Sequence, residues 1–343
     1  MCGIVGYIGP RPVLPILIGG LKKLEYRGYD SAGCAVVTPD NTMLVFKAKG
    51  KVSNLEEKTK ECRQTCTLGI AHTRWATHGI PSETNAHPHL SQSGNLAIVH
   101  NGIIENYATL RDQLRKRGYT FKSETDTEVL VQLIEYIMNI RHSDLATSVR
   151  SALRLCIGAY AIAVVDRRVP TQMVAARKSS PLAIGIGKEN GEFFIASDAS
   201  PIAEYTNRIV YLNDEDVALI EQGKELQIEN LHSGSVDYEI KEVDLDLTML
   251  DKGGFPHFML KEIFDQPTVL KDCMRGRIIE RDGSLRVVLS AVEQHKQRLV
   301  SARRFTIVSC GTSWHAGLIG KQLIEHSCRI HTEVAYASEY RYN

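Results

Sequence analysis

Short apolar runs rich in β-branched residues predict strands in two separate parts of the chain. Over residues 2–102 the runs are CGIVGYI, SAGCAVVT, TMLVFKA, LGIAHTRW and NLAIVHNG. Over residues 159–221 they are AYAIAVVD, QMVAARK, PLAIGIG, EFFIASD, RIVYLN and DVALIE. Turn-forming residues separate the runs, as expected for short strands of a sheet protein.

Between these two groups of strands the hydrophobic period becomes that of amphipathic helices. In ENYATLRDQLRKRG, Tyr107, Leu110 and Leu114 recur at helical spacing, and Gly118 stands where a C-terminal cap belongs. TDTEVLVQLIEYIMN and LATSVRSALRLCIG predict a second and a third helix. Strands, then helices, then strands indicate two sheets with a helical layer outside.

The pattern changes near residue 240. The charged, poorly periodic stretch DYEIKEVDLDLTMLDKGGFP is typical of a domain boundary. Beyond it, HFMLKEIFDQPTVLKDCMRG and SLRVVLSAVEQHKQRLV predict helices, and RRFTIVSCGTSWHAGLIGKQLIEHS predicts strand, small-residue turn and helix. This last segment is the first unit of an open α/β sheet, and the second domain looks cut short after it. We expect domains at residues 1–240 and 301–343, joined by a linker and helices at 241–300.

Composition narrows the class of protein. With 343 residues, 43% of them hydrophobic and 24% charged, the chain has the profile of a multidomain globular protein. Lys and Arg total 41 against 40 Asp and Glu, so charge favours neither nucleic acid nor an anionic membrane as a partner. We expect a small-molecule substrate instead.

Cysteine usage and the apolar runs indicate the compartment. The 8 cysteines are scattered without metal-ligand spacing, which is typical of reduced cytosolic thiols. No basic segment precedes the apolar start, and Pro10, Pro12 and Pro15 interrupt it, so we interpret the N-terminus as mature structure rather than a signal peptide. No apolar stretch approaches the ~20 residues of a transmembrane helix. The prediction is a cytoplasmic protein.

Cys2 is the first candidate for chemistry. If Met1 is removed, Cys2 carries both a thiol and a free α-amine. A thiol with a pKa of about 8.5 needs a base at neutral pH, and an α-amine with a pKa of about 7.7 to 8.0 can accept its proton. This is the arrangement of an N-terminal nucleophile. The alternative is that Cys2 is only a small buried strand residue.

Other polar residues bear on that choice. The amide of Asn101 and the backbone N–H of Gly102, at the end of a strand, could stabilise an oxyanion, although Asn-Gly is also a hairpin signature. Arg74 could bind a carboxylate and Asp126 an ammonium group; the alternatives are a surface arginine and a helix N-cap. Together with a thiol, these groups suit an α-amino acid with an acyl side chain, and glutamine is the obvious candidate.

Two further patterns concern metals and phosphate. His72, His78, His87 and His89 lack acidic partners at ligand spacing, so we expect neither a metal nor a cofactor. In SCGTSWHAG, the residues Gly311, Thr312 and Ser313 precede or begin a predicted helix, whose N-terminus could bind a phosphate. Ordinary helix capping is the alternative for that last motif.

The ordered motifs resemble the family of isomerising glutamine:fructose-6-phosphate amidotransferases, the glucosamine-6-phosphate synthases. They are MCGIVGYIG, LEYRGYDSAG, AHTRWATHG, NAHPH, HNGIIEN, GYTFKSETDTEV, GAYAIAVVD, FIASD, HFMLKEIFDQP and SCGTSWHAG, and they span nearly the whole chain. The resemblance implies an α+β fold: an N-terminal-nucleophile hydrolase sandwich of α-β-β-α layers with antiparallel sheets. The start of an α/β sugar isomerase (SIS) domain would follow.

The resemblance also implies roles for residues of the first domain. Cys2 would attack the glutamine amide with its own α-amine as base, and Asn101 and Gly102 would form the oxyanion hole. Arg74 and Asp126 would bind the carboxylate and amine of glutamine.

Four more residues match substrate-binding positions of the family. Trp75, Thr77 and His78 match its mobile glutamine loop, which closes on substrate and helps to guide ammonia. Arg27 matches a residue near the nucleophile.

For the second domain the resemblance implies phosphosugar contacts at Gly311, Thr312 and Ser313. The whole enzyme would transfer ammonia to fructose 6-phosphate, isomerise the product to glucosamine 6-phosphate and form a homodimer. The synthase half is incomplete in this chain, so the chain by itself is expected only to bind or hydrolyse glutamine. Two alternatives stay open: the glutaminase domain of another class II amidotransferase, and an inactive binding or scaffold fragment that retains Met1.

Overall fold

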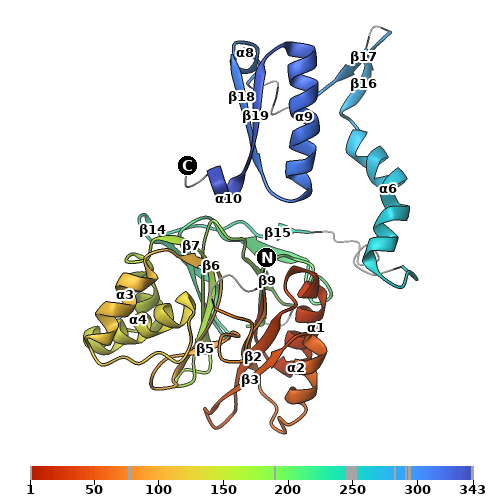
Figure 1. The fold of residues 1–343 in the computed structure, drawn as a ribbon. Coiled ribbons are helices and arrows are strands. Elements are labelled where there is room, and N and C mark those ends of the chain that lie inside the picture. The colour runs from red at the N-terminus through yellow and green to blue at the C-terminus, as the bar shows by residue number, and fades with distance from the viewer. Residues whose placement is uncertain are drawn as a thin grey trace. The chain divides into compact units, whose positions relative to one another are not determined.

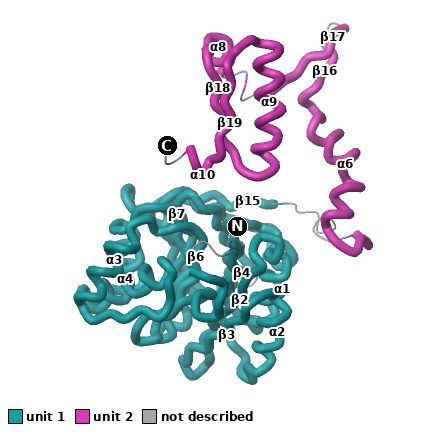
Figure 2. Tube along the Cα trace, in the orientation of Figure 1, with its two compact units in different colours: residues 1–251 teal, residues 252–343 magenta. Residues whose placement is uncertain are grey.

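A computed structural model describes residues 2–75, 79–188, 191–243, 253–281, 283–289, 292 and 295–340. The chain divides into two compact units, residues 1–251 and residues 252–343 (Figure 2). None of the helices in the ranges just given is long and apolar enough to cross a membrane.

The first unit is built on two antiparallel sheets (Figure 1). In the part of the chain that the structure describes, eight strands form the first sheet: β1 Gly3–Ile8, β2 Ser31–Val37, β3 Met43–Lys49, β4 Leu68–Arg74, β9 Ala183–Ile186, β10 Phe193–Ala196, β11 Arg208–Tyr211 and β15 Lys241–Glu242. Their order is β15-β11-β9-β10-β1-β4-β2-β3. Strand β1 is therefore central, with β4 and β10 as its neighbours.

The second sheet has seven described strands: β5 His89–Leu90, β6 Leu96–Ile104, β7 Gly158–Asp166, β8 Gln172–Lys178, β12 Asp216–Glu221, β13 Gln227–Asn230 and β14 Gly234–Ser235. Their order is β14-β13-β12-β8-β7-β6-β5. The long pair β6 and β7 runs antiparallel, with Asn101 opposite Ala161.

Helices cover the outer face of each sheet. Their bounds are α1 Val13–Leu24, the 3-10 helix η1 Glu25–Arg27, α2 Val52–Thr59, α3 Tyr107–Arg115, α4 Asp126–Arg141 and α5 Leu145–Leu153. Helix α1 packs on β1 and β4, and α2 on β3; α4 packs on β6, and α5 on β12. The layers are thus α-β-β-α, and the three helices predicted between the strand groups are confirmed.

Helices α1 and α2 were not predicted from the sequence. Pro10, Pro12 and Pro15 interrupt the apolar run and so argue against a helix, but Pro12 is the N-cap of α1 and Pro15 lies in its first turn. Proline is tolerated there because the first-turn N–H groups have no partner within the helix.

Side-chain alternation along the strands divides the core into layers. On β1, Ile4 and Ile8 pack between the two sheets, where they join Val99 of β6. The intervening Val5 and Tyr7 face α1 and belong to the cluster beneath it. Both faces of these strands are buried, which explains why their sequences are continuously apolar rather than alternating.

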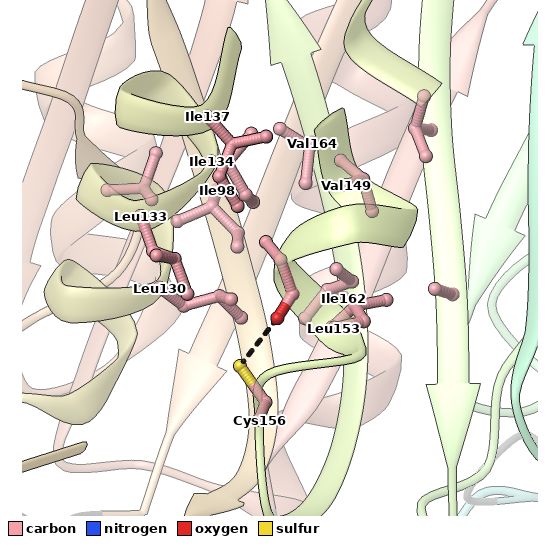
Figure 3. Packing of buried hydrophobic residues seen from close by; sticks show 14 of the residues in the cluster. Ile98, Leu130, Leu133, Ile134, Ile137, Val149, Leu153, Cys156, Ile162 and Val164 are labelled. Atoms are coloured by element: carbon pink, nitrogen blue, oxygen red, sulfur yellow. Dashed lines mark hydrogen bonds between the residues drawn. The ribbon is translucent and has the colours of Figure 1, made fainter. Parts of the chain in front are cut away.

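The third layer of the core lies between the second sheet and its helices (Figure 3). Ile98 of β6 and Val164 of β7 pack there against Leu130 and Ile134 of α4. The thiol of Cys156 is buried beside them and donates a hydrogen bond to the carbonyl of Ala152 over 3.3 Å. Ile98 and Val99 are adjacent in sequence, but Ile98 packs beneath the helices and Val99 packs between the two sheets. Strand β6 therefore contributes to both layers of the core.

The second unit contains these elements: α6 Phe258–Met274, β16 Ile278–Arg281, β17 Ser284–Val287, α8 Lys296–Val300, β18 Arg304–Ser309, α9 Thr312–Cys328, β19 His331–Tyr336 and α10 Ala337–Tyr340. Strands β18 and β19 are parallel and α9 connects them, so the predicted strand, turn and helix are present. The helix predicted for SLRVVLSAVEQHKQRLV is wrong at its start, because β17 pairs with β16. The Asp-Gly pair before β17, with Gly283 at φ +71°, is a hairpin signature that outweighs the helical spacing.

Candidate active site

A cavity of about 260 Å³ in the first unit collects most of the predicted site residues. Its lining consists of Cys2, Arg27, Arg74, Trp75, His87, His100, Asn101, Gly102, Ile103, Thr125, Asp126, Thr127, Ser180 and Pro181. Seven of these were singled out from the sequence as catalytic or substrate-binding candidates. Thr77 and His78 lie outside the described residues.

Cys2 is placed by the pairing of β1 with β4. Gly3 lies opposite Thr73 in that pair, which brings Cys2 to Trp75, just beyond the end of β4. The backbone N–H of Trp75 donates to Sγ of Cys2 over 3.2 Å. Burial raises the pKa of the Cys2 thiol, and the Trp75 N–H opposes this only in part. The sulfur is therefore protonated at neutral pH and needs a base to become a nucleophile.

Asn101 meets Cys2 because the two sheets are stacked. Its Nδ2 donates to the carbonyl oxygen of Cys2 over 3.1 Å and to Oγ of Ser197 over 3.0 Å. Its Oδ1 lies 2.9 Å from Nε2 of His72. The amide thus presents its N–H groups to the residue that carries the thiol.

Gly102 occupies a backbone position that requires glycine. Its φ is +128°, and a Cβ there would lie 2.1 Å from the carbonyl oxygen of Ala159. Strand β6 continues to Ile104, with Gly102 paired to Tyr160. The hairpin alternative for Asn101 and Gly102 is therefore wrong, and the strand extends two residues farther than expected.

Asp126 is the first residue of α4, and it is not the N-cap. The cap is Thr125, whose hydroxyl accepts from the N–H of Glu128. Asp126 is 4% exposed, and its carboxylate accepts from the N–H of Ile104 over 2.8 Å. A buried carboxylate at a helix N-terminus is stabilised by the helix dipole and can pair with a cation in the cavity.

Arg74 ends β4 and is 4% exposed, so the surface-arginine alternative is wrong. Its guanidinium donates to the carbonyl oxygens of Gly79 and Ile80 over 3.2 and 3.5 Å. A cationic and an anionic side chain, Arg74 and Asp126, thus line the same cavity.

Arg27 ends the 3-10 helix and has a fixed partner. Its side chain is 9% exposed and forms an ion pair with Asp198 over 2.6 Å. The ion pair orders the guanidinium at the wall of the cavity that Cys2 also lines.

Three buried histidines, His72, His87 and His89, form a cluster beside the cavity. The sequence pattern suggested them only as possible metal ligands. Burial lowers the pKa of His72 to about 3 and places the pKa values of His87 and His89 well below the usual range. These three imidazoles are therefore neutral at pH 7. Within the residues that the structure describes, no group of three or more His, Cys, Asp or Glu side chains could hold a metal ion.

Several residues at the site were missed from the sequence. His100, Thr127, Ser180 and Pro181 line the cavity, and Ser197 bonds Asn101. His100 directly precedes Asn101 and Ser197 lies in the FIASD motif, so proximity to motifs was the only available signal.

The predicted phosphate residues lie in the second unit. Gly311 has φ +60° and precedes α9, which begins at Thr312 and Ser313. The N–H groups of Trp314 and His315 donate to the carbonyl oxygen of Gly311 over 3.0 and 3.3 Å. The N–H groups of Thr312 and Ser313 precede them and have no acceptor inside the helix, as at any helix N-terminus. Phosphate binding at these three residues stays a prediction.

Comparison with known proteins gives concordant matches. Residues 72–204 match the model of a glutamine amidotransferase domain family. The chain is 59% identical over 343 residues to the glutamine–fructose-6-phosphate aminotransferase [isomerizing] of Bacteroides thetaiotaomicron, and 52% identical over 346 residues to that of Chlorobaculum tepidum. Each alignment covers 100% of this chain and 55% of the relative, so the chain spans about half the length of these curated relatives.

Solved structures support the fold. The allosteric regulatory enzyme of purine biosynthesis matches with a TM-score of 0.58 and 26% identity, over 67% of this chain and 49% of that one. The glutamine phosphoribosylpyrophosphate amidotransferase of B. subtilis matches with a TM-score of 0.59 and 21% identity, over 97% and 65% of the two chains. The predicted sandwich with two antiparallel sheets is confirmed by these likenesses and by the observed layers.

Proposed function

We propose that the chain belongs to the family of isomerising glutamine–fructose-6-phosphate aminotransferases and that its first unit hydrolyses glutamine through a thioester on Cys2. One observation carries the proposal: the thiol of Cys2, the amide of Asn101, the guanidinium of Arg74 and the carboxylate of Asp126 line a single cavity. Each group has a counterpart in glutamine or in the transition state of its hydrolysis.

Charge determines how glutamine would lie in the cavity. Arg74 binds the α-carboxylate with its two-pronged guanidinium, and Asp126 binds the α-ammonium. These contacts direct the side-chain amide of glutamine toward Sγ of Cys2. Trp75 and Arg27 complete the wall around the substrate, and Thr77 and His78 remain candidates for the same role.

The reaction proceeds in two steps. Once Met1 is removed, the α-amine of Cys2 takes the thiol proton, and Sγ attacks the amide carbon of glutamine to form a tetrahedral intermediate. The N–H groups of Asn101 and Gly102 stabilise its oxyanion. The C–N bond breaks, the amine returns the proton to the leaving nitrogen, and ammonia departs from a thioester. Water then attacks the thioester, releasing glutamate and the thiol.

The second unit suggests the use of the ammonia. The relatives are named for fructose 6-phosphate, and the parallel pair β18 and β19 around α9 suits the start of a sugar isomerase domain. In the whole protein, Gly311, Thr312 and Ser313 would bind the sugar phosphate while ammonia converts fructose 6-phosphate to glucosamine 6-phosphate. The whole protein would act in the cytoplasm as a homodimer.

Intact mass measurement after incubation with 6-diazo-5-oxonorleucine, a glutamine mimic that alkylates an activated thiol, tests the proposal. We expect loss of Met1 and one adduct, mapped by peptide analysis to Cys2 and absent from Cys2→Ser. Excess glutamine should protect against it. A chain without Met1 that forms no adduct, or forms adducts at exposed Cys273, Cys310 or Cys328 instead, contradicts the proposal.

A further inference from the structure

We propose that His72 is a positioning residue that sets the orientation of the Asn101 side-chain amide, so that its N–H groups rather than its oxygen face Cys2. The inference rests on the proposed glutaminase function and adds a residue that does not itself line the cavity. It concerns a hydrogen bond between the two sheets, because His72 lies on β4 and Asn101 on β6.

The neighbours of His72 determine where its proton lies. Nε2 of His72 is 2.9 Å from Oδ1 of Asn101 and 3.1 Å from the carbonyl oxygen of His100. A backbone carbonyl only accepts hydrogen bonds, so Nε2 must carry the hydrogen. Nδ1 of His87, 3.2 Å from the same nitrogen, then presents its lone pair.

The opposite ring nitrogen agrees with this assignment. The imidazole of His72 is neutral at pH 7, so it carries one hydrogen, and a hydrogen on Nε2 leaves a bare lone pair on Nδ1. Among the described residues, Nδ1 of His72 is buried without a hydrogen-bond partner. The hydrogen bonds of the His72 ring are thus made through Nε2, while its face packs against the ring of His87 at 4.2 Å between centroids.

The carbonyl of Cys2 determines which atom of the Asn101 amide faces it. It lies 3.1 Å from that amide and only accepts, so Nδ2 must face it and Oδ1 must face His72. A reversed amide would set Oδ1 against the Cys2 carbonyl and against a developing oxyanion. Reversal would therefore replace an oxyanion donor by a repulsive oxygen.

Ser197 cannot enforce this orientation without His72. Its hydroxyl accepts from Nδ2 of Asn101 over 3.0 Å and from the N–H of Ile4 over 2.8 Å. A hydroxyl also donates, so it can bond Oδ1 of a reversed amide equally well. Discrimination between the two orientations of the amide therefore depends on the acceptor at Cys2 and on the donor at His72.

Two amide substitutions at position 72 separate the donor from the bulk of the ring. The amide of His72→Gln reaches the position of Nε2 and retains a donor, whereas His72→Asn is one methylene shorter and does not reach it. We expect H72N to lower kcat for glutamine hydrolysis roughly 10- to 100-fold with KM little changed, because loss of an oxyanion donor costs about 10²- to 10³-fold. H72Q should restore kcat to within about tenfold of the wild type. His89→Asn is the matched control, since His89 is buried in the same cluster but bonds Thr125.

Two readouts exclude a merely structural effect. Alkylation of Cys2 by iodoacetamide needs no oxyanion hole, so H72N should retain the wild-type alkylation rate. The side-chain 15N–1H resonances of Asn101, assigned by their loss in Asn101→Asp, should shift in H72N and not in H72Q.

Either of two results overturns the proposal: unchanged kcat in H72N, or equal losses of kcat and alkylation in H72N and H89N. The NMR comparison decides the orientation even if the wild type hydrolyses no glutamine. Failure of the proposed function is thereby distinguished from failure of the positioning role, and the comparison of H72Q with wild type remains if H72N does not fold.

Discussion

The backbone N–H of Trp75 donates a hydrogen bond to Sγ of Cys2 over 3.2 Å, across the pairing of β1 with β4. This single donor stabilises a thiolate too weakly to offset burial, so the pKa of Cys2 remains raised. A site of this kind depends on proton removal during the reaction and holds no preformed thiolate.

The pH dependence of Cys2 alkylation follows. Because the pKa is raised, the thiolate fraction at a given pH is smaller than in a free cysteine, and the alkylation rate should rise with pH. We expect a midpoint above the ordinary value of about 8.5. Iodoacetamide labelling followed by peptide mass analysis measures it, with N-acetylcysteine as reference. A midpoint below that of the reference would contradict the prediction.

Gly102→Ala should both destabilise and inactivate the protein. The new Cβ meets the Ala159 carbonyl at 2.1 Å in addition to the strain of φ +128°, so we expect a loss of about 3 kcal/mol or more in the free energy of unfolding. Gly118→Ala is the control: φ is +88°, nothing lies within 4 Å, and strain alone costs about 1 kcal/mol. Urea unfolding compares the two. Equal losses would mean that the close contact at Gly102 does not matter.

Asp126→Asn should weaken glutamine binding while leaving the fold intact. The asparagine oxygen still accepts from the N–H of Ile104, but the charge that would pair with the substrate ammonium is lost. We expect KM for glutamine to rise roughly 10- to 100-fold, the equivalent of a charged hydrogen bond of about 1.5–3 kcal/mol, with kcat changed far less. Asp144→Asn, at the N-cap of α5, is the control and should leave KM unchanged. A fall in kcat at constant KM would assign Asp126 a different role.

The buried histidines predict acid lability. Their pKa values are lowered in the folded state, so below about pH 6.5 the unfolded chain binds protons that the folded chain excludes. Above that pH the difference in proton binding disappears, and it does not affect stability. Below it, each histidine lowers the free energy of unfolding by about 1.4 kcal/mol per pH unit. Urea unfolding at pH 7.5, 6.5 and 5.5 measures it.

Substitution identifies the histidines responsible for this slope, the change in the free energy of unfolding per pH unit. His89→Gln removes one buried imidazole and should reduce the number of protons taken up on unfolding by about one. His326→Gln, in an exposed position of α9, should leave the slope unchanged. A slope that is insensitive to His89 would place the acid lability elsewhere.

Local patterns predicted much of the fold. Helices α3, α4 and α5 were found because apolar residues recur at helical spacing with caps at their ends, and the strands because their apolar runs are short and β-branched. Helix α1 was missed because its sequence contains prolines. A proline is tolerated in the first turn of a helix but not in its interior, and the sequence alone does not show where α1 begins. The β16–β17 hairpin was missed because SLRVV fits either period and only pairing with a partner strand decides between them.

By itself the sequence determined which groups are available for chemistry: a thiol at position 2, an Asn-Gly pair, an arginine and an aspartate in ordered motifs. The tertiary structure alone decided among the alternatives at each of them. It buried Arg74, kept Asn101 and Gly102 within a strand, and made Thr125 the cap of α4 in place of Asp126. Pairing of β6 with β7 keeps Asn101 and Gly102 within a strand, and the stacking of one sheet on the other brings β4 and β6 into contact. That contact joins residues distant in sequence, such as His72 and Asn101, through packing and hydrogen bonds that no local period encodes.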